Sequence, residues 1–186
     1  MELLERAQLD EETERYLAFI RNRVDALRQL TEELFRYSVF ASVEEMQPER
    51  LALNRALEES LLSYYGAFSE KGIRPELDLP QEDVFRTLDP KLLGRVFGNI
   101  LQNALKYSGG DLHVSMTQDG KITFSNAAPN LTPVAVARMF DRFYTVESAR
   151  GSTGLGLAIA KLLTLRMGGD ISAEYCDGVL FTHLKF

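Results

Sequence analysis

Apolar positions between residues 11 and 38 recur at spacings of three and four, with charged residues between them. Because an α-helix has about 3.6 residues per turn, this spacing places them on one face and predicts an amphipathic helix from Glu11 to Ser38. Asp10 is expected to cap its N-terminus. The helix needs a partner surface, since helical propensity alone stabilises it little. Its apolar stripe comprises Tyr16, Ile20, Val24, Leu27, Leu30 and Leu34.

After Pro48 the pattern changes, and helical segments alternate with short strands and hairpins. We therefore expect two units, residues 1–46 and residues 47–186. Asn54 is expected to cap a helix that runs to Ser69. The other expected helices are 90–107, 133–140 and 155–167, and the expected strands are 51–53, 72–79, 85–88, 111–117, 121–125, 171–175 and 179–185. This order predicts an α+β fold, a two-layer α/β sandwich in which about three helices cover one face of a mixed or antiparallel sheet.

Composition narrows the possible partners and compartment. The formal net charge of −6 disfavours nonspecific attraction to nucleic acid or anionic lipid, so we expect neither as a partner. The single cysteine, Cys176, has no partner for an internal disulfide, and no Cys/His cluster suggests zinc. The acidic N-terminus lacks the pattern of a signal peptide, and no apolar run reaches the roughly 20 residues of a membrane span. We expect a cytoplasmic chain that makes no contact with a membrane.

The segment FGNILQNALKYS places Asn99, Asn103 and Lys106 on one helical face, at positions i, i+4 and i+7. An amide oxygen suits Mg²⁺, and a lysine neutralises phosphate charge. The same pattern fits an ordinary solvent-exposed face, because such residues are common on exposed helices. This segment alone leaves both interpretations open.

The segment GSTGLGLAIAKLL places Gly154 and Gly156 immediately before a predicted helix. The free N–H groups of a helix N-terminus bind phosphate oxygens, and glycines permit a close approach. The Lys and Ser/Thr of a P-loop are missing, and the glycines do not follow a strand as in a dinucleotide-binding fingerprint. The two commonest nucleotide-binding folds are therefore disfavoured.

Three segments, NILQNALKYS, FDRFYTVESAR and STGLGLAIAKLL, follow one another with a hairpin between the first two. Together they resemble the N box, F box and second glycine box of histidine kinases. The resemblance covers Leu51 to Phe186 and is closest to the catalytic, ATP-binding domain of two-component sensor kinases, within the wider superfamily of gyrase-like ATPases. It implies ATP and Mg²⁺ as ligands and transfer of the γ-phosphoryl group to a histidine.

The resemblance also implies roles for individual residues. Asn103 looks like the Mg²⁺ ligand, supported by Asn99, while Lys106 resembles a phosphate contact and Tyr107 an adenine contact. In the family's first glycine box, DxGxG, an aspartate binds the adenine amino group, but here Asn126, Ala128 and Asn130 hold those places. Asn126 keeps an acceptor oxygen without the charge, so we expect adenine recognition to survive and affinity to fall.

The remaining expected nucleotide contacts surround a lid predicted between Tyr144 and Thr153. Phe140 and Phe143 are expected to anchor that lid by packing into the core. Arg142 and Arg150 flank this lid and are secondary candidates for neutralising phosphate oxygens, but they fit equally well as surface arginines paired with Asp141 or Glu147. The further expected contacts are Thr153, Gly154, Leu155 and Gly156.

A phosphoacceptor histidine box resembling HELRTPL is missing from this sequence, so we expect no catalytic residue of that kind. His113 and His183 alternate within predicted strands and are expected to be structural. Residues 16–41 resemble the second helix of a dimerisation hairpin and residues 1–9 the tail of the first, so 1–46 is expected to be a remnant of that hairpin. We expect ATP binding without autophosphorylation, a response regulator as partner of a parent kinase anchored in the membrane upstream, and a homodimer formed through the N-terminal helix.

Two alternatives remain open at this point. One is a pseudokinase scaffold that binds no nucleotide, suggested by the altered position Asn126. The other is an ATPase, or a serine kinase such as an anti-sigma factor, from the same superfamily. Relatives that hydrolyse ATP resemble this N box but carry a glutamate at the place of Asn99, where it serves as a general base. An amide cannot take up that proton, which favours the histidine kinase.

Overall fold

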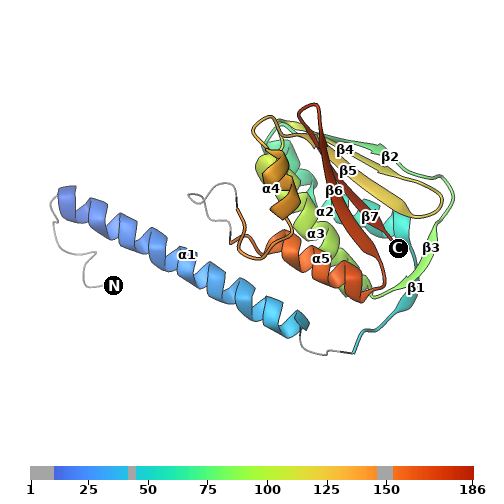
Figure 1. The fold of residues 1–186 in the computed structure, drawn as a ribbon, viewed down its shortest axis with the longest axis horizontal. Coiled ribbons are helices and arrows are strands. Elements are labelled where there is room, and N and C mark those ends of the chain that lie inside the picture. The colour runs from blue at the N-terminus through green and yellow to red at the C-terminus, as the bar shows by residue number, and fades with distance from the viewer. Residues whose placement is uncertain (1–10, 42–44, 146–152) are drawn as a thin grey trace.

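A computed structural model describes residues 11–41, 45–145 and 153–186 of the chain, so the predicted cap Asp10 lies outside the described residues. Helix α1 projects as a long rod from a body made of two layers (Figure 1). The elements are α1 Glu11–Ala41, β1 Glu49–Ala52, α2 Leu53–Glu70, β2 Arg74–Asp78, β3 Phe85–Leu88, α3 Pro90–Tyr107, β4 Asp111–Met116, β5 Lys121–Ala127, α4 Pro133–Arg138, α5 Gly156–Arg166, β6 Asp170–Cys176 and β7 Val179–Lys185.

The main sheet has five strands in the order β2-β4-β5-β7-β6. Strand β2 runs parallel to β4, and the other neighbours are antiparallel. Helices α2, α3 and α5 cover one face of this sheet (Figure 1). The prediction of a mixed sheet in an α+β sandwich is therefore confirmed.

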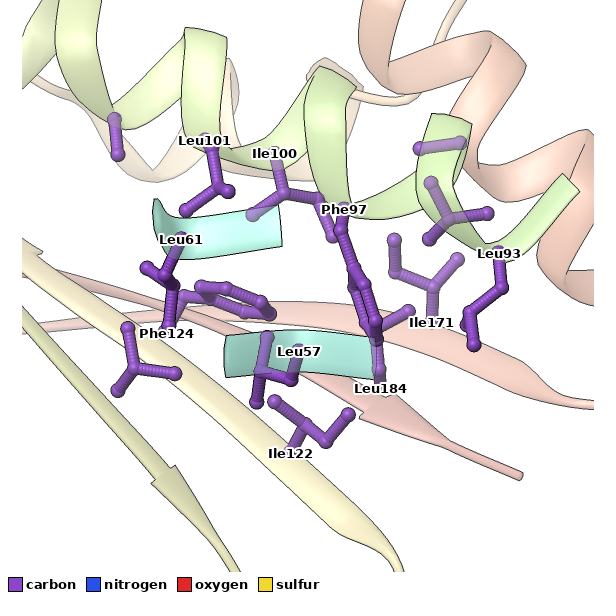
Figure 2. Close-up of a cluster of buried hydrophobic side chains, with 14 of the residues drawn as sticks. Leu57, Leu61, Leu93, Phe97, Ile100, Leu101, Ile122, Phe124, Ile171 and Leu184 are labelled. Atoms are coloured by element: carbon purple, nitrogen blue, oxygen red, sulfur yellow. The ribbon is translucent and has the colours of Figure 1, made fainter. Parts of the chain in front are cut away.

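The core lies between these helices and the inner face of the sheet. Along β4, β5 and β7 buried and less buried positions alternate, as expected for strands with one covered face. Figure 2 shows Phe97 of α3 reaching toward the sheet beside Leu184, with Leu57 of α2 close by. The ring centroid of Phe97 lies 6.4 Å from that of Phe124, at a tilted angle that suits two aromatic rings.

Both histidines lie on the open face of the sheet, away from the helices. His113 is exposed on β4, between the buried Leu112 and Val114. On β7, Nδ1 of His183 lies 3.0 Å from Oγ1 of Thr123. The expectation that both histidines occupy strands is confirmed.

Asn54 does not cap α2 as predicted. The cap position is Ala52, and Asn54 is the second residue of the helix, with its side chain buried. Its Oδ1 accepts a hydrogen bond of 3.2 Å from the backbone N–H of Val84, and its Nδ2 donates to the carbonyls of Pro80 and Glu82 at 3.4 and 3.3 Å. The prediction was wrong because a buried backbone N–H far along the chain requires this acceptor.

Asp89 joins the segment after α1 to the start of α3. Its Oδ1 accepts from the backbone N–H groups of Lys91 and Leu92 at 2.9 and 3.1 Å, which caps α3 at the predicted Pro90 start. Its Oδ2 accepts from the N–H of Gln47 at 2.9 Å. Burial acts to raise the pKa of Asp89, but the three N–H donors outweigh burial and hold the pKa below its ordinary value of 3.8.

This depressed pKa predicts acid-dependent stability. The ionised carboxylate stabilises the fold above the unfolded value of 3.8, and this contribution is lost as the pH falls through the lower folded pKa. Urea unfolding at about pH 5 and about pH 3 should therefore show a smaller acid-induced loss of stability in Asp89→Asn than in the wild type. Asp78→Asn, at an exposed carboxylate, is the matched control and should retain the wild-type loss. An equal loss in Asp89→Asn and the wild type would contradict the assignment.

Candidate functional site

Helix α3 separates an apolar face from a polar one. The buried face consists of Leu92, Leu93, Val96, Phe97, Ile100, Leu101 and Ala104. The polar face carries Asn99, Gln102, Asn103 and Lys106, which all line one cavity of about 360 Å³. Burial of the apolar face therefore fixes the direction of these polar side chains, and the cavity is of a size that holds a small-molecule ligand.

A turn after β5 forms a second wall of this cavity. Residues Ala128 to Leu131 line it, and Leu131 N–H donates to the carbonyl of Ala128 at 3.0 Å. Two further hydrogen bonds hold Ala128 in place. Its N–H donates to the carbonyl of Gly178 at 2.7 Å, and its carbonyl accepts from the Tyr175 hydroxyl at 3.1 Å. This wall is thus tied to the end of the main sheet.

The start of α5 forms the third wall, through Thr153, Gly154, Gly156 and Leu157. Within the described residues no side chain caps α5, so the N–H groups of its first turn remain available beside the cavity. A Cβ at Gly156 would lie 3.4 Å from Oδ1 of Asn99, which shows how closely α5 approaches α3 here. A helix N-terminus in this position favours a bound anion.

The cavity combines a positive charge with neutral amides. Among its described lining residues, Lys106 is the charged one, and its Nζ lies 5.4 Å from the ring centroid of Tyr107. Asn99, Gln102 and Asn103 contribute amide groups. Within the described residues no group of three or more His, Cys, Asp or Glu side chains is arranged to hold a metal ion. The donor set suits phosphate together with a hard cation held by an amide oxygen.

Most of the predicted site residues meet in this cavity. Those that line it are Asn99, Asn103, Lys106, Tyr107, Ala128, Thr153, Gly154 and Gly156, together with Asn130 from the altered box. Arg150 lies outside the described residues, as does most of the predicted lid.

Three other predicted residues do not line the cavity. Asn126 is buried at the end of β5, where its Nδ2 donates to the carbonyl of Ala127 at 3.0 Å. Leu155 is fully buried, and Arg142 is exposed. These three residues are therefore not part of the cavity lining, and their roles stay predictions.

Several lining residues were missed by sequence reasoning. Gln102 stands three residues after Asn99, so helical spacing could have found it. Tyr144 lies in the quoted F box but was assigned only to the lid. Thr145 likewise lies in the F box, and Leu157 lies in the second glycine box, but neither was singled out. The others are Pro129, Leu131, Ala135, Met139 and Leu180, which no motif singled out.

Phe140 and Phe143 differ from expectation. Phe140 packs against the core, but Phe143 is 52% exposed. The backbone of Phe143 has a positive φ of 61°, and its N–H donates to the carbonyl of Gly154 at 3.1 Å. This turn directs the ring outward, so the prediction that it packs into the core was wrong.

A sequence profile of the family described as histidine kinase-, DNA gyrase B-, and HSP90-like ATPase matches residues 88–185. The chain belongs to this family. The matched range contains every residue that lines the cavity. The domain of this family binds ATP.

Individual relatives in this ATPase family are sensor kinases. The chain is 30% identical over 175 residues to the sensor histidine kinase YcbM of Bacillus subtilis, covering 89% of this chain and 56% of that protein. It is 31% identical over 180 residues to the sensor protein VanSC of Enterococcus gallinarum, covering 92% of this chain and 50% of that one. The chain therefore spans about half the length of these curated relatives. Its body is the ATPase domain of the sensor histidine kinase type.

A solved structure agrees on the fold. The histidine kinase ThkA, determined in complex with the response regulator protein TrrA, superposes with a TM-score of 0.72 at 19% identity, covering 97% of this chain and 52% of that one. At this identity the likeness shows the fold alone. Within the described residues no helix combines the length and the apolar composition that a bilayer span needs.

Proposed function

We propose that this chain binds Mg²⁺-ATP in the cavity and donates its γ-phosphoryl group to a histidine on another polypeptide. The observation that carries the proposal is the meeting of the amide and lysine face of α3 with the uncapped start of α5 across one cavity. Phosphoryl transfer is catalysed chiefly by positioning and charge neutralisation. These two elements supply both functions from rigid helices.

Each wall has a proposed role. Asn103 coordinates Mg²⁺ with support from Asn99, Lys106 neutralises the phosphates, and Tyr107 packs along the adenine. The first N–H groups of α5, beside Gly154 and Gly156, bind phosphate oxygens. The remaining proposed contacts are Ala128, Asn126, Thr153, Leu155, Arg142 and Arg150.

The acceptor histidine comes from outside this sequence in our proposal. His113 and His183 are the chain's two histidines, both lie on the open face of the sheet, and neither lines the cavity. A response regulator is then the next recipient, by analogy with the ThkA and TrrA complex. We assign residues 1–46 to a dimerisation hairpin and 47–186 to the catalytic domain of a cytoplasmic segment, whose parent kinase is anchored in a membrane.

Helix α1 is the proposed contact between two copies. Five apolar side chains of its stripe are 47–62% exposed, namely Tyr16, Ile20, Val24, Leu27 and Leu34. A stripe at heptad-like spacing is covered when two such helices pack together. We therefore propose a homodimer formed through α1.

Titration of a fluorescent ATP analogue tests the nucleotide site. Asn103→Ala should weaken Mg²⁺-dependent binding about tenfold, because loss of one polar contact to a charged group costs about 1.5–3 kcal/mol. Without Mg²⁺ the wild type and the variant should converge. Asn22→Ala is the matched control, since Asn22 is exposed on α1, away from the cavity.

The outcome separates the alternative functions. No binding of nucleotide at about millimolar concentration would overturn the proposal in favour of a scaffold, since a Kd of about 1 mM corresponds to a binding free energy of only about −4 kcal/mol. Steady phosphate release would point to an ATPase, and acid-stable phosphoserine on a partner to a serine kinase. Phosphorylation of an added histidine-bearing acceptor domain is the result we expect.

A further inference from the structure

Tyr144 lines the cavity, and its aromatic ring contacts a cation outside the cavity lining. This cation belongs to Arg138, which does not line the cavity. The Cζ atom of Arg138 nevertheless lies 4.5 Å from the centroid of the Tyr144 ring, well within the range of a cation–π contact. Tyr144 thus belongs to the cavity wall, and its ring contacts the guanidinium of a residue outside that wall.

Local structure fixes the guanidinium in this place. Arg138 is the last residue of α4, and its Nε lies 3.3 Å from Oδ2 of Asp141. The N–H of Asp141 donates back to the carbonyl of Arg138 at 2.8 Å, and the N–H of Tyr144 to the carbonyl of Asp141 at 3.4 Å. Consecutive turns therefore join the cation to the aromatic residue that it covers.

The backbone beside Tyr144 is also held. The neighbouring Phe143 donates its N–H to the carbonyl of Gly154, which belongs to the opposite wall. The main chain is therefore fixed by this bond, and the ring direction is left to side-chain contacts. For an aromatic side chain with two rotatable bonds, one cation on the ring restricts that remaining freedom and reduces the entropy lost on binding.

We propose that Arg138 is a positioning residue which holds Tyr144 as an aromatic wall against the bound nucleoside triphosphate. Arg138 then tunes nucleotide affinity and residence time without touching the ligand. The proposal rests on the nucleotide-binding function proposed above. It adds Arg138 as a determinant of affinity. Arg138 does not line the cavity and lies outside the three sequence boxes, whereas Tyr144 belongs to the F box.

A double-mutant cycle tests this coupling. Displacement of a fluorescent ATP analogue with excess ATP gives the dissociation rate. Arg138→Gln should raise that rate about two- to fivefold, as expected for loss of an exposed cation–π contact. The same substitution should have its full effect in a Tyr144→Phe background, which keeps the ring, and none in Tyr144→Ala, which removes it. Arg138→Lys should restore part of the wild-type rate.

Lys161→Gln is the matched control for loss of a positive charge. Its Nζ lies 5.5 Å from the ring centroid of Phe140, so this substitution also removes a cation from an aromatic ring near the cavity while leaving Tyr144 untouched. An unchanged rate in Lys161→Gln supports the proposal, and an equal rise there overturns it. A rise from Arg138→Gln that persists in Tyr144→Ala also overturns it. If the wild type binds no nucleotide, both proposals fail, whereas normal binding with no effect of Arg138→Gln overturns this inference alone.

Discussion

Phe97→Ala is expected to lower the free energy of unfolding by about 3–5 kcal/mol. Phe97 is fully buried on α3 and packs between that helix and the sheet, where its ring meets Phe124 (Figure 2). Truncation removes the ring's burial and leaves a cavity, and close-packed neighbours fill such a space only in part. The loss is a large fraction of the stability of a domain of this size.

Urea unfolding followed by circular dichroism measures this effect, with the slope of the transition checked for change. Leu62→Ala is the control on α2, because Leu62 is 71% exposed and its truncation should change stability by about 0.5 kcal/mol or less. A loss in Phe97→Ala no larger than in Leu62→Ala would contradict the assignment of Phe97 to the core.

Local signals made α3 and its polar face predictable. Asp89 and Pro90 mark the start of the helix, and its 3.6-residue periodicity separates buried from cavity-facing positions. The turns at Asp119-Gly120 and Asp177-Gly178 were also predictable, because an Asp-Gly pair is a common signal of a tight hairpin turn. In the structure Gly120 and Gly178 have the positive φ values of 84° and 81° that such turns require. Each of these features is determined by residues close together in the sequence.

Long-range features could not be read from the sequence. Asn54 accepts from Val84, thirty residues away, so its buried role is invisible in the local capping pattern. Strands β1 and β3 pair in a separate two-stranded sheet, and β2 joins the main sheet in parallel to β4. Strand pairing depends on contacts made only in the folded state, whereas periodicity reports only which face is buried.

The candidate site also combines features that local sequence patterns predict with features that depend on long-range contacts. Asn99, Asn103 and Lys106 were found because helical spacing and a family resemblance both indicated them. Gly154 was found through its box, but its contact with the chain at Phe143 was not, and neither was the cation on Tyr144. These contacts join α4, α5 and the segment between them, and no short pattern encodes such a crossing.

Gly154→Ala is expected to weaken nucleotide binding about thirtyfold or more. Gly154 has a φ of 70°, and a Cβ there would lie 2.6–2.7 Å from backbone atoms of Phe143 and Tyr144. The conformation costs an alanine about 1–2 kcal/mol, and overpacking adds about 1–3 kcal/mol. We expect the clash to be relieved when the segment at Gly154 moves apart from the segment at Phe143 and Tyr144. We call the close approach of these two segments the crossing. This movement would shift Tyr144 and the start of α5 out of the cavity wall. At about 1.4 kcal/mol per tenfold change, even the lower estimates together give this loss.

Gly72→Ala separates the strain from the crossing. Gly72 has the same φ of 70°, but nothing lies within 4 Å of a Cβ placed there. This control should lose about 1–2 kcal/mol of stability from the backbone conformation alone and bind the fluorescent ATP analogue like the wild type. Gly154→Ala should retain the circular dichroism spectrum of the folded body, since Gly154 lies outside the helices and strands that build the core around Phe97. Equal nucleotide affinity in the two variants would show that the approach of Gly154 to Phe143 and Tyr144 does not shape the site.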